Sequence, residues 1–237
     1  QLWGNPLFDW DKLKETGYKW WIDRVKANLS LYDIIRIDHF RGFESYWSIN
    51  YGEETAINGK WEKGPGIDLF NAIRESLGDL NIIAEDLGTL TDDVVKLKND
   101  TGFPGMRILQ FAFSQDPENE YLPHNYDNNT VVYTGTHDND TTNSWFSNLN
   151  DIEKQEVREY INVYDDNGIV YGLIRAALSS VADIAIIPMQ DYLNLGGFAR
   201  INTPGLAAGN WQWRLKNDGL SDELAKTISH LTEIYGR

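Results

Sequence analysis

The sequence predicts an α/β protein, specifically a large part of a (β/α)8 TIM barrel. Short apolar runs rich in β-branched residues alternate with amphipathic helical stretches, which is the pattern of parallel βαβ units. Three of the predicted strands begin near residues 81, 106 and 131, about 25 residues apart, as the repeat of such a barrel requires. A doubly wound sheet would give similar spacing, so the spacing favours a barrel without excluding that alternative.

Five segments read as strands buried on both faces, and five as helices between or after them. The predicted strands are 32–37, 81–84, 106–113, 130–134 and 181–188, and the predicted helices are 68–77, 91–98, 151–162, 169–180 and 221–235. A closed barrel needs eight strands. We therefore expect one catalytic barrel domain over residues 1–237 that is incomplete at its amino terminus and supplies about the last five strand–helix units.

Two segments, 50–66 and 202–217, are long and rich in glycine, aromatic and polar residues. Such composition predicts loops over a substrate rather than a domain boundary. The clearest helix lies at 68–77, where Leu69, Phe70, Ile73 and Leu77 repeat at helical spacing and Gly78 stands where a helix would stop.

Composition excludes several classes of function. The 237 residues carry 36 acidic and 21 basic side chains, a formal charge of −15 that would repel nucleic acids and anionic lipids. The apolar runs are shorter than the 18 or so residues that span a bilayer. Cysteine is absent, which excludes disulfide and thiolate chemistry. We therefore expect neither nucleic acid nor a membrane as partner.

Acidic residues follow three of the predicted strands. Arg36 and Asp38 are two residues apart and share one strand face, so the guanidinium should hold Asp38 ionised, as a nucleophile requires. Glu85 ends the second strand and would need only a site from which water is excluded to act as a general acid. Asp138 follows the strand at 130–134. Taken singly, the first pair also reads as a structural ion pair and Glu85 as part of a helix-capping cluster.

Together, carboxylates at one rim of a barrel are the apparatus of a glycosidase, in which one attacks the anomeric carbon and another protonates the leaving oxygen. The motifs that carry a more specific resemblance are RIDHFRG at 36–42, AEDLG at 84–88, PGMR at 104–107 and GTHDNDT at 135–141, with GNPL at 4–7 and GNWQW at 209–213. In these strings the chain closely resembles the 4-α-glucanotransferases called amylomaltases or disproportionating enzymes.

The resemblance implies the roles of nine residues. It makes Asp38 the nucleophile, Glu85 the general acid and base, and Asp138 the stabiliser of the transition state. The glucose unit at the cleavage point would be oriented by Arg36, His39 and His137, and the flanking sugars would be held by Gln1, Trp3 and Asn210.

The implied activity is that of a retaining 4-α-glucanotransferase. It would cleave an α-1,4 bond and pass the glucanosyl unit, held on the enzyme, to the 4-hydroxyl of an acceptor glucan or glucose. Residue spacing leaves open an α-glucan hydrolase of the amylase group, and a truncated barrel could be a glucan-binding fragment without turnover. Products from maltotriose separate transfer from hydrolysis, since only transfer makes longer oligosaccharides.

No cofactor is expected, and no metal, because His137, Asp138 and Asp140 match neither a zinc motif nor a calcium loop. The expected partners are a maltooligosaccharide or α-1,4-glucan substrate and the amino-terminal half of the same barrel. Family habit, together with the lack of a secretory leader in the sequence from Gln1 onward, predicts a cytoplasmic location.

Overall fold

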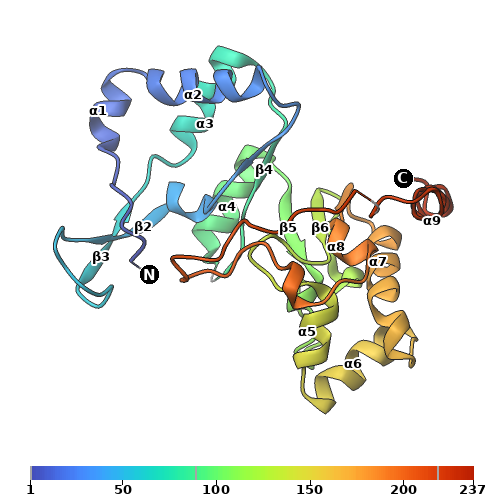
Figure 1. The fold of residues 1–237 in the computed structure, drawn as a ribbon. Coiled ribbons are helices and arrows are strands. Elements are labelled where there is room, and N and C mark those ends of the chain that lie inside the picture. Colours follow the sequence, from blue (N-terminus) through green and yellow to red (C-terminus); the bar gives the residue numbers. More distant parts are fainter. Residues whose placement is uncertain (1, 89, 218) are drawn as a thin grey trace. The chain divides into compact units, whose positions relative to one another are not determined.

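The structure is a computed structural model that describes residues 2–88, 90–217 and 219–237. Contacts divide the chain into two compact units, Gln1–Met106 and Arg107–Arg237, each of which combines helices with parallel strands (Figure 1). The α/β class predicted from the sequence is therefore confirmed. Among the described residues, no helix has the length and apolarity needed to cross a bilayer.

The first unit is built on two parallel strands and a separate hairpin. Its elements are α1 (Trp10–Glu15), α2 (Lys19–Leu29), β1 (Ile35–Ile37), the 3-10 helix η1 (Phe40–Phe43), β2 (Ser45–Ile49), β3 (Gly59–Lys63), α3 (Ile67–Leu77), β4 (Ile82–Ala84) and α4 (Asp92–Thr101). Strands β1 and β4 pair in parallel, with Ile35 opposite Ile82 and Ile37 opposite Ala84. This register brings the residues that follow the two strands to the same end of the pair.

The core of the first unit confirms the helix predicted at 68–77. Leu69, Phe70 and Ile73 are buried on α3 and pack with Ile82 of β4. Gly78 ends the helix with a φ of +83°, a conformation that costs glycine little. The apolar stripe therefore fixes α3 against the strand pair that leads to Glu85.

The hairpin corrects the loop predicted at 50–66. Residues 59–63 form β3, which pairs antiparallel with β2. Trp47 and Trp61 lie directly opposite each other in this register, with ring centroids 5.4 Å apart in an edge-to-face arrangement. Cross-strand aromatic pairs stabilise a hairpin, so residues that suggest a substrate loop by composition here form regular structure.

The second unit contains a three-stranded sheet covered by helices. The boundary between the units falls within β5 (Gly105–Ile108), which is followed by the 3-10 helices η2 (Leu109–Phe111) and η3 (Pro123–Asn125) and by β6 (Thr130–Tyr133), α5 (Thr142–Asn148), α6 (Asp151–Ile161), η4 (Asp166–Gly168), α7 (Ile169–Ser179), β7 (Ile184–Ile186), α8 (Met189–Tyr192), η5 (Gly197–Ala199) and α9 (Asp222–Ile234). The strand order is β5-β6-β7, and β6 pairs with β7 in parallel.

All five predicted strands form, but two predictions about them are wrong. The strand expected at 106–113 ends at Ile108, where the chain turns into a 3-10 helix. Burial on both faces holds for β4 and β6, whereas β1 and β7 are only partly buried. Among the described residues, β6 has a strand on each side, whereas β1 and β7 each pair with one strand. Strand β4 also pairs with one strand, but Ile82 and Ala84 are buried in the apolar cluster formed with α3 and α4.

The predicted helices at 91–98, 151–162, 169–180 and 221–235 are confirmed as α4, α6, α7 and α9, within three residues at their ends. The segment 202–217 contains no helix or strand, as predicted. Helices α1, α2, α5 and α8 were not predicted. They are short or carry aromatic residues on several faces, which obscures a helical period.

Candidate active site

In the first unit, the turn after β1 folds around Glu85. The backbone N–H of Glu85 donates to the Ile37 carbonyl at 2.9 Å, and the Phe40 N–H donates to the Glu85 carbonyl at 3.0 Å. The His39 N–H donates a short hydrogen bond to the Glu85 carboxylate. His39 has a φ of +48°, in the left-handed region that a non-glycine residue seldom adopts. The turn directs the His39 amide at the Glu85 carboxylate. Backbone strain such as the positive φ of His39 is typical of functional sites.

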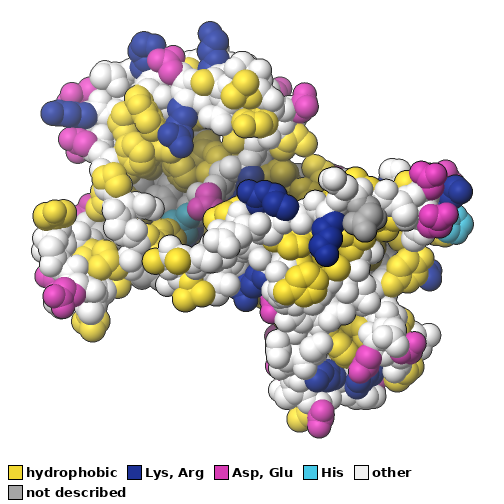
Figure 2. Space-filling view, viewed as in Figure 1, with side chains coloured by type: hydrophobic (Ala, Val, Ile, Leu, Met, Phe, Trp, Pro, Cys, Tyr) yellow, Lys and Arg dark blue, Asp and Glu magenta, His cyan; other side chains and the backbone are white. Residues whose placement is uncertain are grey.

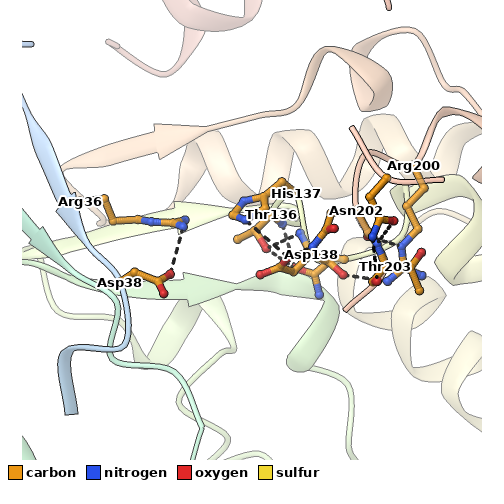
Figure 3. Close-up of polar contacts among 10 residues, drawn as sticks. Arg36, Asp38, Thr136, His137, Asp138, Arg200, Asn202 and Thr203 are labelled. Carbon is orange, nitrogen blue, oxygen red and sulfur yellow. Dashed lines mark hydrogen bonds and ion pairs between the residues drawn. The ribbon is translucent and has the colours of Figure 1, made fainter. Parts of the chain in front are cut away.

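Asp38 lies in the same turn beside Arg36. The closest guanidinium nitrogen of Arg36 is 3.5 Å from Oδ1 of Asp38, as the two-residue spacing predicts (Figure 3). The Asp38 side chain is 79 % exposed, whereas Arg36 is 28 % exposed. Asp38 is therefore open to an incoming ligand and lies beside a partly buried cation.

Burial raises the pKa of Glu85 to about 7. The His39 amide and Arg36 act in the opposite direction, while the charges of Asp38 and Asp86 raise the pKa further. At neutral pH the carboxyl group can therefore either give or take a proton. Asp38 and Glu85 both follow strands of one parallel pair. Asp38 is exposed beside a cation, whereas Glu85 is partly buried and has a raised pKa.

The neighbouring acid, Asp86, has a structural role. It is 1 % exposed, accepts a hydrogen bond from the Met106 N–H at 2.7 Å, and forms an ion pair with Lys98 at 2.9 Å. These contacts fix the backbone on the far side of Glu85. The helix-capping alternative for the acidic cluster is not supported, since the N-cap of α4 is Thr91, whereas Glu85 contacts His39 and Asp86 contacts Lys98 and Met106.

In the second unit, the loop after β6 carries His137 and Asp138. The loop is closed by Asn139, whose Oδ1 accepts from the Thr136 N–H at 2.9 Å and from its hydroxyl at 2.8 Å. Nε2 of His137 lies 3.5 Å from Oδ1 of Asp138. The Asp138 side chain is 48 % exposed, so its carboxylate is accessible to solvent.

The segment after η5, with Arg200 and Asn202, makes hydrogen bonds to this loop (Figure 3). The Asn202 amide donates to Oδ1 of Asp138 at 2.5 Å, and Arg200 donates to the Asp138 carbonyl at 2.7 Å. The Asn202 N–H donates to the His137 carbonyl at 3.1 Å. Asp138 is thus fixed at its backbone by Arg200 and at its carboxylate by the Asn202 amide.

A buried carboxylate, Asp191, ties together the two ends of the same loop. It is 3 % exposed and accepts hydrogen bonds from the hydroxyls of Thr134 at 2.5 Å and Thr142 at 2.7 Å, and from the Thr142 N–H at 2.9 Å. Thr134 precedes the loop and Thr142 follows it. Burial raises the pKa of Asp191, and the three hydrogen bonds oppose that rise. Sequence patterns gave no indication of this residue, because α8 is a single turn.

The residues predicted to hold flanking sugars have different surroundings. Trp3 is 56 % exposed and packs edge-to-face on His39, with ring centroids 4.8 Å apart. The Asn210 amide accepts from the Thr203 N–H at 2.9 Å and donates to the Leu206 carbonyl at 2.9 Å, so it shapes its own loop. Gln1 lies outside the described residues.

One residue that sequence reasoning missed is Trp211, whose ring lies 5.2 Å from that of His137. It is 56 % exposed and has a φ of +63°. The GNWQW string pointed to this loop, but a lone tryptophan is more often a core residue than a sugar contact. Among the described residues, no group of three or more His, Cys, Asp or Glu is arranged to hold a metal ion.

Comparison with known proteins identifies the family. The 4-alpha-glucanotransferase family model matches residues 1–221. The chain belongs to the 4-alpha-glucanotransferase family. A 4-alpha-glucanotransferase of Clostridium butyricum is 56% identical over the whole chain, and one of Synechocystis sp. is 54% identical, also over the whole chain. The resemblance seen in the motifs is therefore confirmed.

Among solved structures, the chain is similar to the amylomaltase of Streptococcus agalactiae in complex with acarbose, with a TM-score of 0.96 and 41% identity over the whole chain. The chain spans about half the length of the 4-alpha-glucanotransferases it matches, with 49% of the Clostridium protein, 47% of the Synechocystis protein and 48% of the Streptococcus chain covered.

Proposed function

We propose that the protein is a retaining 4-α-glucanotransferase, and that this chain carries its catalytic carboxylates. The observation that carries the proposal is the pairing in one turn of an exposed Asp38 beside Arg36 with a Glu85 whose pKa is raised to about 7. A charged nucleophile and a protonated acid are the two groups that a double displacement needs. Membership of the 4-alpha-glucanotransferase family supports the same roles.

In the first step, the Asp38 carboxylate attacks the anomeric carbon of an α-1,4 bond. The bond from that carbon to the bridging oxygen breaks, and the oxygen takes the proton of Glu85 and leaves as the free 4-hydroxyl of a shorter glucan. Arg36 faces Asp38 and orients the attacking oxygen. The covalent ester on Asp38 conserves the energy of the glucosidic bond.

In the second step, Glu85 is a carboxylate and accepts the proton of an incoming 4-hydroxyl. The hydroxyl oxygen forms a bond to the anomeric carbon, Asp38 is released, and the new α-1,4 bond has the original configuration because two inversions have occurred. A group with a pKa near the working pH exchanges its proton in both directions with little penalty. Glu85 meets that condition.

The other predicted residues take supporting roles. Asp138 stabilises the positive charge of the transition state, and His39 and His137 orient the glucose unit at the cleavage point. Trp3 and Asn210, with Gln1, hold the flanking sugars. Trp3 offers an exposed ring next to His39, which suits this role. The Streptococcus amylomaltase in complex with acarbose supports a carbohydrate ligand for this site.

We further propose that residues 1–237 form one catalytic domain and supply about the last five strand–helix units of a (β/α)8 barrel. Among the described residues, β1 in the first unit and β7 in the second each pair with one strand only. Apolar residues near these strands are exposed, including Tyr32, Ile34, Val181 and Ile186. An amino-terminal half of the barrel, in line with the length of the relatives, would cover them. A cytoplasmic location stays a prediction.

The relatives named above are 4-alpha-glucanotransferases and an amylomaltase, so they give no support to the hydrolase or to a fragment that only binds glucan. The test is to incubate the full-length protein with maltotriose and to separate the products. Transfer gives glucose together with maltopentaose and longer chains. Glucose and maltose alone would establish hydrolysis, and unchanged maltotriose would leave a binding protein.

A further inference from the structure

A hollow with an aromatic wall lies beside the turn that contains Asp38 and His39 in the first unit, called the catalytic turn below. It has a volume of about 360 Å³, which is in the range of small-molecule sites. His39 and Trp3 form one side, and Trp47, Ile49 and Trp61 of the β2–β3 hairpin form the other. Figure 2 shows hydrophobic side chains in yellow over the hairpin, at the left of the view. None of the predicted roles uses the hairpin residues.

The two hairpin tryptophans are held in place, although Trp61 is exposed and Trp47 is only partly buried. Trp61 is 56 % exposed, and the guanidinium of Arg41 lies 4.5 Å from the centre of its ring. The Trp47 indole N–H donates to the Ala56 carbonyl at 2.8 Å, and its ring lies against Gly59, where any larger side chain would collide with it. An exposed ring that is already immobilised loses little conformational entropy when a ligand stacks on it.

The chemistry of the lining suits an uncharged ligand with apolar faces and hydroxyl edges. Trp3, Trp47 and Trp61 provide flat apolar surfaces, while Asn5, Arg41 and Tyr46 bring polar groups to the same hollow. A pyranose ring has C–H faces that pack on indole and hydroxyls that bond to amides and guanidinium groups. Because His39 borders both the hollow and Glu85, a chain bound at the catalytic turn could continue into it.

We propose that this hollow is a glucosyl-binding subsite in which Trp61 is the stacking platform for α-glucan residues beyond the cleaved bond. The proposal rests on the proposed glucanotransferase function for the identity of the ligand. It assigns the β2–β3 hairpin to recognition of chain length rather than to the chemical step.

The test measures maltoheptaose binding by isothermal titration calorimetry in the full-length protein with Glu85→Gln, which slows turnover by about 10²- to 10⁴-fold. Adding Trp61→Ala should raise Kd about tenfold, the effect of losing roughly 1.4 kcal/mol of binding free energy. Trp61→Leu, which keeps apolar bulk for the hairpin but has no flat ring, should raise Kd to a similar extent. An unchanged Kd in both variants would overturn the subsite.

Trp20 provides a matched control on α2. It is 46 % exposed and has the Arg24 guanidinium 5.3 Å from its ring centre, but it does not line the hollow. Trp20→Ala should leave Kd within about twofold, whereas a rise equal to that of Trp61→Ala would count against a localised subsite. Maltotriose turnover by the unmodified protein tests the glucanotransferase function separately. Binding that depends on Trp61 without any turnover would therefore reject that function and keep the subsite.

Discussion

Glu85 in the first unit and Asp138 in the second are both acidic residues that follow a parallel strand, yet their surroundings differ. Glu85 is half-buried and held by backbone amide and carbonyl groups, and burial raises its pKa to about 7. Asp138 is 48 % exposed, and its carboxylate accepts the Asn202 amide. A position after a parallel strand therefore does not by itself fix the chemistry of a carboxyl group, since it is burial that raises the pKa of Glu85.

The two regions also differ in what supports the functional loop. In the first unit, the turn 38–39 is held directly by Glu85, one of the proposed reacting groups. In the second unit, the residues that flank the loop of His137 and Asp138 are held by Asp191, a buried residue outside the proposed reacting groups. In the second unit, substitutions should therefore distinguish residues that take part in the reaction from residues that only hold the loop in place.

The largest expected effect is that of Asp38→Asn. The amide cannot form the covalent intermediate, so the rate of glucan transfer from maltotriose should fall by more than about 10⁴-fold. The variant should still bind maltoheptaose, because the other groups of the turn remain. A rate within tenfold of the unmodified protein would remove Asp38 from the role of nucleophile.

Glu85→Gln should lower kcat by about 10²- to 10⁴-fold, the usual contribution of a positioned acid and base. In the unmodified protein, activity should decline above about pH 7 as Glu85 loses the proton that the leaving oxygen needs. The residual activity of the variant should lack this limb of the pH profile.

The raised pKa of Glu85 also has a consequence for stability. A carboxyl group whose pKa is higher in the folded than in the unfolded state destabilises the fold increasingly as pH rises from about 4.5 to 7. Glu85→Gln should therefore raise Tm relative to the unmodified protein at pH 8 but not at pH 4. Equal Tm differences at both pH values would contradict the burial assigned to Glu85.

Asp191→Ala should have a smaller effect on catalysis and a larger one on stability. Three donors lose their acceptor, so the free energy of unfolding in urea should fall by about 1–3 kcal/mol, and kcat should fall with little change in KM. Asp191→Asn should restore part of both, because its carbonyl can still accept from the Thr142 N–H.

Asp166 is a suitable control for Asp191. It is an acidic residue of the same unit, paired with Arg158 at 2.7 Å, but its side chain is 63 % exposed. Asp166→Ala should change stability by less than about 1 kcal/mol and leave kcat unaltered. A loss as large as that of Asp191→Ala would show that the loop is not specifically supported by the buried carboxylate.

The smallest effect is expected from Asn202→Ala, which removes the side-chain donor to Asp138. We expect kcat to fall about tenfold, since a hydrogen bond to a charged group contributes roughly 1.5 kcal/mol. Asn143→Ala, which breaks an exposed amide contact to Asn194 at 2.7 Å, should stay within about twofold of the unmodified protein. If both variants behave alike, Asn202 does not position Asp138.

Much of the fold could be predicted because it depends on local patterns. The apolar stripe of α3 and the mainly apolar runs of β4 and β6 are visible in the sequence, and the structure has a helix and two strands at these positions. The β2–β3 hairpin could not be predicted in the same way. Its stability comes from the cross-strand pair Trp47 and Trp61, which lie 14 positions apart, and no local period marks such a pair.

By itself, the sequence determined which acids follow the strands, that Arg36 stands beside Asp38, and which family the motifs indicate. Only the tertiary structure decided that burial removes Glu85 from water. It also decided that Asp86, one position later, is buried and forms an ion pair with Lys98. It also revealed the loop support by Asp191 and the hollow behind His39. The physical reason is that strand periodicity and residue type are local properties, whereas desolvation and hydrogen bonding depend on residues distant in the chain.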